Sequence, residues 1–77
     1  MRTNNKQKIK VLESILQQIV DKSKVVTDYD IEILENDEEL LVNVALSNED
    51  GIVIWEREGT YFEMYCECEL ILWPLLD

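Results

Sequence analysis

Hydrophobic residues in the first third of the chain recur at the spacing of an α-helix. Four of them follow one another at intervals of three, four and three residues: Ile9, Leu12, Leu16 and Ile19. This spacing places them on one face of a helix. Asn4 or Asn5 can cap the segment at its start. The pattern therefore predicts an amphipathic helix over about residues 5–23, with its apolar face toward a core.

The remainder of the chain alternates between hydrophobic and polar positions. A period of two residues is typical of strands with one buried face. The predicted strands cover about residues 25–34, 39–46, 52–58 and 60–73. Turn-forming residues separate them, with the clearest turn at 47–51, where the segment ends in Asp50-Gly51, and a tight turn at Glu58-Gly59. Pro74 is expected to end the last strand.

Short connections between neighbouring strands favour an antiparallel meander. The predicted fold class is α+β, with one N-terminal helix packed on a four-stranded antiparallel meander, and with residues 1–77 forming a single domain. One helix covers only one face of such a sheet. The other face would expose apolar residues that include Leu41, Ala45, Ile71 and Trp73. A chain of 77 residues has a small core, so we expect a homodimer that buries part of this face or the C-terminal segment.

Charge is divided unequally along the chain. Residues 1–24 carry six cations against two acids, a net charge of +4, whereas residues 25–77 carry Arg57 against fifteen acids, a net charge of −14. The whole chain has a formal charge of −10. Such asymmetry predicts association with a partner of opposite charge.

The composition excludes most catalytic and metal-binding chemistry. The chain has no histidine, which is the usual general base at neutral pH, and its two glycines are too few for a phosphate-binding loop. A zinc site needs about four ligands, but only two cysteines are present. We therefore expect no enzyme activity, no catalytic residue, no metal and no cofactor. Cys66 and Cys68 are interpreted as small apolar residues on a buried strand face, with an intermolecular disulfide or a reactive thiol as the alternative.

Neither a membrane span nor a secretory leader is expected. The sequence contains no stretch of about 18 apolar residues, and no apolar run of signal-peptide type follows the basic start of the chain. The chain is therefore expected to be a soluble intracellular protein.

The acidic residues form the main candidate site. In a strand, alternate residues lie on one face at intervals of about 6.6 Å. The pattern therefore predicts one row of carboxylates on the strand at 25–34 and a second row on the strand at 60–73, with more acids in the first turn. The candidate partner-binding residues are Asp28, Asp30, Glu32, Glu35, Asp37, Glu38, Glu63, Glu67 and Glu69. Trp55, Tyr61 and Tyr65 lie among the acids in sequence and are expected to provide apolar anchor points.

Carboxylates held in rows on a rigid sheet resemble the phosphates of duplex DNA, which carries one charge per about 1.7 Å of axis. A protein that grips phosphates with lysine and arginine could grip these rows instead. The alternative is that the charge only maintains solubility and keeps the edge strands from pairing with other chains.

In length, charge and helix-plus-sheet layout, the chain resembles the small, acidic, phage-encoded inhibitors that mimic DNA. It is most similar in size and expected dimeric build to the dimeric inhibitor of the nucleoid protein HU. The resemblance rests on no shared motif and transfers no residue assignment. It implies a protein that binds a basic DNA-binding protein of the bacterial host, by preference an HU-like one, and blocks its DNA binding, with no direct contact to nucleic acid or membrane. The alternative is a protein of a second class: an immunity protein or antitoxin that neutralises one specific toxin or enzyme, and whose acids match a basic active-site cleft.

Overall fold

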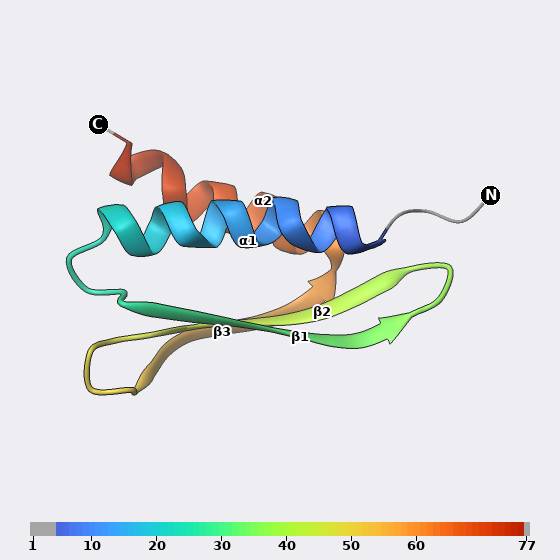
Figure 1. Ribbon diagram of the computed structural model, residues 1–77, viewed down its shortest axis with the longest axis horizontal. Helices are drawn as coiled ribbons and strands as arrows, with labels where there is room; N and C mark the ends of the chain where they lie inside the picture. Colours follow the sequence, from blue (N-terminus) through green and yellow to red (C-terminus); the bar gives the residue numbers. More distant parts are fainter. Residues whose placement is uncertain (1–4, 77) are drawn as a thin grey trace.

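The computed structural model describes residues 5–76, which form two layers (Figure 1). The elements follow the order α1 (Asn5–Lys22), β1 (Asp28–Asn36), β2 (Leu40–Ser47), β3 (Val53–Thr60), α2 (Tyr61–Leu72) and a short 3₁₀ turn, η1 (Trp73–Leu75). The strands form an antiparallel meander in the order β1-β2-β3. Both helices lie side by side on the same face of this sheet, and the other face carries no helix formed by residues 5–76.

The first helix and the first three strands were predicted by the periodicity. The apolar face of α1 buries Leu12, Ile15, Leu16 and Ile19, as the helical spacing requires. After α1 the chain turns at Ser23, whose hydroxyl oxygen accepts hydrogen bonds from the backbone N–H groups of residues 25 and 26. The strands begin or end up to three residues from the predicted positions, which is the ordinary uncertainty of element boundaries.

The turn between β2 and β3 forms where Asp50-Gly51 predicted it. The amide of Gly51 donates a hydrogen bond to the carbonyl of Asn48 at 2.9 Å. Gly51 has a φ of 79°, a left-handed conformation that favours glycine at the end of such a turn. The side-chain oxygen of Asn48 accepts from the amides of Asp50 and Ile52. This network fixes the loop and thereby the register of β3 on β2.

The fourth strand is absent from the structure, and the prediction of one helix on a four-stranded meander was wrong. Residues 61–72 form helix α2, and β3 continues through the expected turn at Glu58-Gly59 as far as Thr60. The sheet therefore has three strands, and two helices cover its inner face.

A capping box explains why the chain turns into a helix at this point. The hydroxyl of Thr60 accepts a hydrogen bond from the amide of Glu63 at 3.2 Å, and the carboxylate of Glu63 accepts from the amide of Thr60 at 2.9 Å. Two backbone N–H groups at the start of the helix are thus satisfied reciprocally. The carboxylate oxygen Oε1 of Glu63 lies only 2.7 Å from the position that a Cβ atom on Gly59 would occupy. A side chain at position 59 would therefore crowd the Glu63 carboxylate, and glycine leaves room for the cap.

The core lies between the two layers. It contains the helix residues Leu12, Leu16 and Ile19 together with Met64 and Cys68 of α2. The sheet contributes the inward side of β2, which consists of Leu40, Val42, Val44 and Leu46. All four β2 residues are buried, as the alternation in the sequence predicted. β2 is the central strand of the sheet, so its inner face forms the floor of the core.

Candidate functional site: an acidic sheet face

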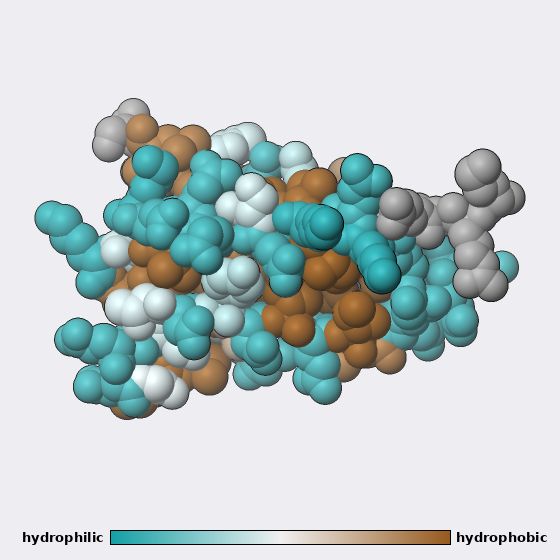
Figure 2. Space-filling view, in the orientation of Figure 1, coloured by the Kyte–Doolittle hydropathy of each residue, from teal (hydrophilic) through white to brown (hydrophobic). Residues whose placement is uncertain are grey.

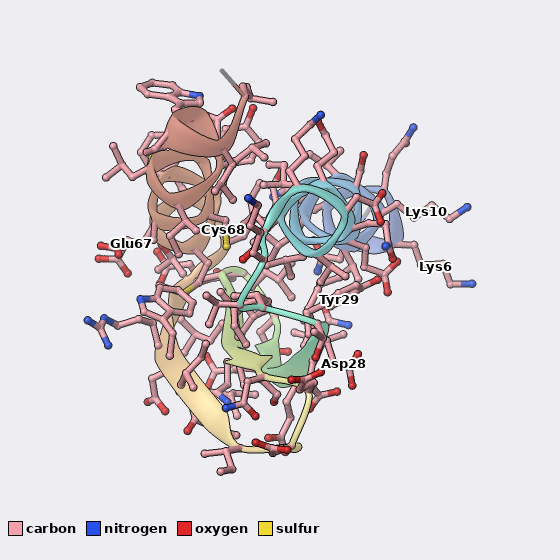
Figure 3. The ribbon with its side chains drawn as sticks, turned by 90° about the vertical axis from the view of Figure 1, so that its left-hand side faces the viewer. Lys6, Lys10, Asp28, Tyr29, Glu67 and Cys68 are labelled. Atoms are coloured by element: carbon pink, nitrogen blue, oxygen red, sulfur yellow. The ribbon has the colours of Figure 1, made fainter. Side chains whose placement is uncertain are left out.

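The strand register sorts the acidic residues of the sheet by face. Residues directly opposite one another in an antiparallel pair share a face. Tyr29 and Ile31 lie opposite Leu46 and Val44 and therefore face the helices. Asp28, Asp30 and Glu32 lie opposite Ser47, Ala45 and Asn43 and therefore face away from the helices. Figure 3 shows this division at the start of β1, where Tyr29 lies on the helix side and Asp28 on the opposite side.

An irregularity in β1 brings one more carboxylate onto the same side. The register shifts between Ile33 and Glu35, so that Leu34 is an extra residue and Glu35 pairs with Leu41. Without this bulge, strict alternation would turn Glu35 toward the helices. With it, Asn36 faces α1, where its side-chain oxygen accepts a hydrogen bond from Asn5. The β1 row thus contains four carboxylates, which belong to Asp28, Asp30, Glu32 and Glu35.

The third strand supplies a second row. Glu56 and Glu58 lie opposite Ala45 and Asn43, so they share the outward side of the sheet with the β1 row. We call this side the acidic face and define it by six residues: Asp28, Asp30, Glu32, Glu35, Glu56 and Glu58. The two rows stand on the outer strands and are separated by β2. Because neighbouring strands lie about 4.8 Å apart, the rows are roughly 10 Å apart at the backbone.

The central strand presents no charge between the two rows. Its outward residues are Leu41, Asn43, Ala45 and Ser47. The amide of Asn43 donates a hydrogen bond to the Glu56 carboxylate at 2.8 Å, which links the centre to the β3 row. The acidic face therefore consists of an uncharged central strand with one row of carboxylates on each side.

The acidic face contains no cation among the residues that the structure describes. Arg57 is the one lysine or arginine in residues 25–76, and it lies opposite Val44 on the helix side of β3. Its guanidinium carbon is 5.4 Å from the centre of the Trp55 ring, and one of its nitrogens donates to the carbonyl of Glu56. Within residues 5–76 no lysine or arginine forms an ion pair with a carboxylate. The charges of the acidic face are therefore not neutralised by the described part of the protein.

The remaining candidate acids lie elsewhere. Asp37 and Glu38 are exposed in the connection between β1 and β2, at the end of the sheet where the β1 row finishes. Glu63, Glu67 and Glu69 belong to α2 in the helix layer and do not form a second row. Glu67 points away from α1 into solvent (Figure 3). The sequence analysis thus placed Asp28, Asp30 and Glu32 correctly on one side of a strand. It placed Glu35 in the first turn, although this residue belongs to β1, and it misplaced the acids of the C-terminal segment.

Local interactions distinguish the α2 acids from those of the sheet. Glu63 is engaged in the capping box. Glu63 and Glu67 also line a shallow groove between β3 and α2, together with Arg57 and with Glu58 at the edge of the acidic face. Glu69 lies beside Tyr65 and raises the pKa of the Tyr65 hydroxyl by its negative charge.

Two members of the site were missed as partner-binding candidates, namely Glu56 and Glu58. In the sequence they read as acids at a strand end, because the predicted turn at Glu58-Gly59 ended the strand there. The alternation of Glu56, Glu58 and Thr60 was the available signal, but its phase depends on a second bulge at Ile54, between Leu46 and Ser47 of the partner strand. A bulge of this kind leaves no mark in a pattern of hydrophobic residues.

The aromatic residues are not anchors on the acidic face. Trp55 faces the helix layer, opposite Leu46. Tyr61 and Tyr65 are half-buried on α2, with ring centres 6.0 Å apart, and the ammonium of Lys8 lies 5.5 Å from the centre of the Tyr61 ring. These rings join α1 to α2 instead. Exposed apolar side chains near the sheet belong to Ile52, Val53 and Ile54 at the β2–β3 turn and to Ile33 and Leu34 at the bulge.

Figure 2 shows the side of the molecule that carries α1 and the edge of β1. Hydrophilic side chains cover most of it, and a hydrophobic patch lies between the helix and the strand. Ile33 and Leu34 of β1 are each 47% exposed, and β1 is an edge strand of the sheet, with no described strand beside it on its outer side.

The two cysteines occupy different environments, which corrects the expectation of a shared buried face. In a helix, residues two apart lie on nearly opposite sides, so Cys68 is buried and Cys66 is exposed. Cys68 lies between the two helices (Figure 3). Burial, reinforced by the charge of Glu67, raises the pKa of the Cys68 thiol to about 12.

The described carboxylates lie in separate rows and are not grouped around a point where a metal ion could be coordinated. Within residues 5–76, no three side chains of the metal-ligating types converge on one point. What the acidic face can do chemically is to accept hydrogen bonds and pair with cations over an extended surface.

Comparison of the chain with protein-family models, with curated proteins and with solved structures finds no match. No helix within residues 5–76 is both long enough and apolar enough to cross a membrane.

Proposed function

We propose that this protein is a DNA mimic that binds a basic DNA-binding protein and blocks its access to DNA, acting in the cytoplasm of a bacterial host cell. The observation that carries the proposal is the pair of carboxylate rows on the acidic face, with a neutral strip between them. Two rows of negative charge flanking a groove are also the electrostatic outline of duplex DNA.

The dimensions support this comparison. The separation of roughly 10 Å between the rows falls between the widths of the DNA minor groove, about 6 Å, and major groove, about 12 Å. Along each row, neighbouring carboxylates on alternate residues are about 6.6 Å apart, against one phosphate per about 3.4 Å of axis on each DNA strand. The face therefore carries about half the linear charge of a DNA strand, so the favoured partner binds DNA mainly through its backbone. An HU-like nucleoid protein meets this description.

The fixed sheet explains why such a surface could bind tightly. Carboxylates on paired strands lose little freedom on binding because their backbone is already ordered. They also have no internal cation to release, since the described residues provide no ion pair. Solubility alone does not require the six acids to share one side of the sheet while Arg57 lies on the other.

The test is competition with DNA. A purified HU-type nucleoid protein is bound to a fluorescent duplex, and the acidic protein is titrated into the complex. Displacement is expected for duplexes of any sequence, because the rows copy backbone charge and not base edges. The affinity for the nucleoid protein should fall by roughly 10- to 100-fold between low and physiological salt, since charge pairing dominates the contact.

Matched neutralisations separate the acidic face from net charge. One variant combines Asp28→Asn, Asp30→Asn and Glu32→Gln. Its control removes the same three charges elsewhere, through three substitutions: Glu13→Gln, Asp21→Asn and Glu67→Gln. Paired, desolvated carboxylates are worth about 1–3 kcal/mol each, so the first variant should lose about 100-fold or more in affinity and the control much less.

Several results would reject the proposal. Equal loss of affinity in the two variants would show that only net charge matters. Failure of the wild-type protein to displace DNA from any basic bacterial DNA-binding protein would rule out mimicry. Binding to a single enzyme without competition by DNA would instead identify a dedicated neutralising protein.

A further inference from the structure

Helix α2 has a second apolar face that nothing in the described structure covers. Phe62, Leu70 and Trp73 are 71%, 61% and 58% exposed, and Cys66 is exposed between them. At 100° per residue, these four side chains fall within an arc of about 80°, opposite the face that buries Met64, Cys68 and Leu72. We call Phe62, Cys66, Leu70 and Trp73 the outer stripe. A helix that is apolar on both sides is normally buried on both sides.

We infer that the outer stripe is the contact surface of a two-fold dimer in which the α2 helices of two copies cross in antiparallel directions at Cys66. This inference is independent of the proposed function, which involves the other layer of the molecule. Of the two contacts that the sequence suggested for a homodimer, part of the second sheet face or the C-terminal segment, it selects the C-terminal segment, because the second sheet face is acidic.

The exposed area fits a second copy. Taking about 200 Å² for an aromatic side chain, Phe62 and Trp73 together present roughly 250 Å². With Leu70, Cys66 and the edges of the flanking glutamates, each copy offers roughly 500 Å². Two copies would bury roughly 1,000 Å² in total, which is the area at which a specific interface is expected. The glutamates at 63, 67 and 69 border the stripe on both sides and supply the polar rim of such a contact.

The sequence of the stripe is compatible with two-fold symmetry. Phe62 and Leu70 each lie four residues from Cys66. In an antiparallel pair centred on Cys66, Phe62 of one copy therefore meets Leu70 of the other, twice, while Cys66 meets its own equivalent at the axis. A small side chain at the crossing point allows close approach of the helices.

The same geometry makes Cys66 a reporter of the contact. Packed helices have axes about 8–10 Å apart, and Cα atoms lie about 2.3 Å from each axis. Residues that face each other directly therefore have Cα atoms about 3.4–5.4 Å apart, which overlaps the range of about 4.4–6.8 Å found in disulfides. Cys68 is 0% exposed and on the opposite side of α2, so it cannot form this link.

The first experiment measures assembly of the full chain by sedimentation. The wild-type protein should be a dimer at micromolar concentration. Because each copy carries a charge of −10, raising the salt concentration should tighten the dimer several-fold. Phe62→Gln or Leu70→Gln should weaken it at least tenfold, whereas Val25→Gln should not, although Val25 is 60% exposed and lies outside α2.

The second experiment is disulfide trapping with diamide, which takes up the two electrons and two protons that a pair of thiols loses. Cys68→Ala, which retains Cys66, should give a covalent dimer on a denaturing gel. Cys66→Ala, which retains Cys68, should give none. Combining Cys68→Ala with Leu70→Gln should abolish the link, which excludes random collision.

Three outcomes would overturn the inference. The first is a wild-type protein that stays monomeric at millimolar concentration in high salt. This outcome would stand if the monomer were found to bind lipid vesicles, because the outer stripe would then contact lipid and not a second copy. The second is a dimer that survives both glutamine substitutions in the stripe. The third is a covalent dimer that forms equally well through Cys68.

Discussion

The junction between β3 and α2 depends on the capping box, and replacing Thr60 by alanine tests this dependence. The substitution removes the hydroxyl that accepts from the Glu63 amide at 3.2 Å, and it leaves the Glu63 carboxylate bonded to the Thr60 amide at 2.9 Å. Loss of a threonine at the start of a helix costs about 1 kcal/mol, within a range of roughly 0.5–2 kcal/mol. For a domain of this size, 1 kcal/mol corresponds to a fall in Tm of about 4–8 °C.

The measurement is equilibrium denaturation in urea, followed by circular dichroism, of Thr60→Ala against Thr27→Ala. Thr27 is exposed, lies outside the strands, and its side chain forms no hydrogen bond with the described residues, so its replacement should change the free energy of unfolding by less than about 0.5 kcal/mol. A Glu63→Ala variant and the double variant complete a cycle. Because the two side chains act as one cap, the double variant should be more stable than the sum of the single losses predicts.

Equal stability of the Thr60 and Thr27 variants would refute the role of the cap. Additive effects of the Thr60 and Glu63 substitutions would show that the two hydrogen bonds act separately. In the first case the formation of α2 would have to be explained by the burial of Met64, Cys68 and Leu72 alone.

Three further predictions concern the reactivity of the two cysteines, the pH dependence of stability and the β2–β3 turn. In dilute native protein, iodoacetamide should modify Cys66 and spare Cys68, as mass spectrometry would show; equal modification would contradict the burial of Cys68. The pKa of Cys68 in the folded protein is about 12, above the ordinary value of 9.0, so the folded state holds the thiol proton more tightly than the unfolded state does. The contribution of the protonated Cys68 thiol to the free energy of unfolding is therefore complete below pH 9 and is lost as the pH rises toward 12. Wild-type stability should therefore fall more steeply over that interval than that of Cys68→Ala. Asn48→Ala removes the acceptor for the amides of Asp50 and Ile52 and should cost about 1–2 kcal/mol in urea denaturation, and an unchanged midpoint would contradict this.

The type of an element, helix or strand, could be predicted where the hydrophobic residues follow a single periodicity, either that of a helix or that of a strand. α1 has one apolar face, and β2 alternates strictly between Leu40 and Leu46, so their types were correctly predicted. The acids at 28, 30 and 32 were correctly placed on one side because β1 pairs regularly with β2 up to Ile33. Beyond that point, bulges in β1 and β3 change the phase of the side chains. The positions of Glu35, Glu56 and Glu58 therefore needed the register.

The segment 60–73 was misread because two periodicities coincide in it. Met64, Cys68 and Leu72 form one helical stripe at intervals of four residues, and the exposed residues 62, 66 and 70 form another, offset by two. Together they reproduce the alternation of a strand. The capping sequence from Thr60 to Glu63 was the local signal that could have separated the two readings. An exposed leucine and a buried leucine look identical in a sequence. The hydrophobic pattern alone therefore could not distinguish a helix from a strand in this segment.

The placement of α1 and the acidic face in different layers gives the molecule a permanent electric dipole. Lysines of α1, such as Lys6 and Lys10, extend from the helix layer, whereas the six carboxylates lie on the far side of the sheet (Figure 3). A positively charged body that approaches in solution exerts a torque on such a dipole and turns the sheet toward itself before contact. Fewer collisions then occur in an unproductive orientation, so the arrangement raises the rate of encounter even where it adds nothing to the lifetime of the complex.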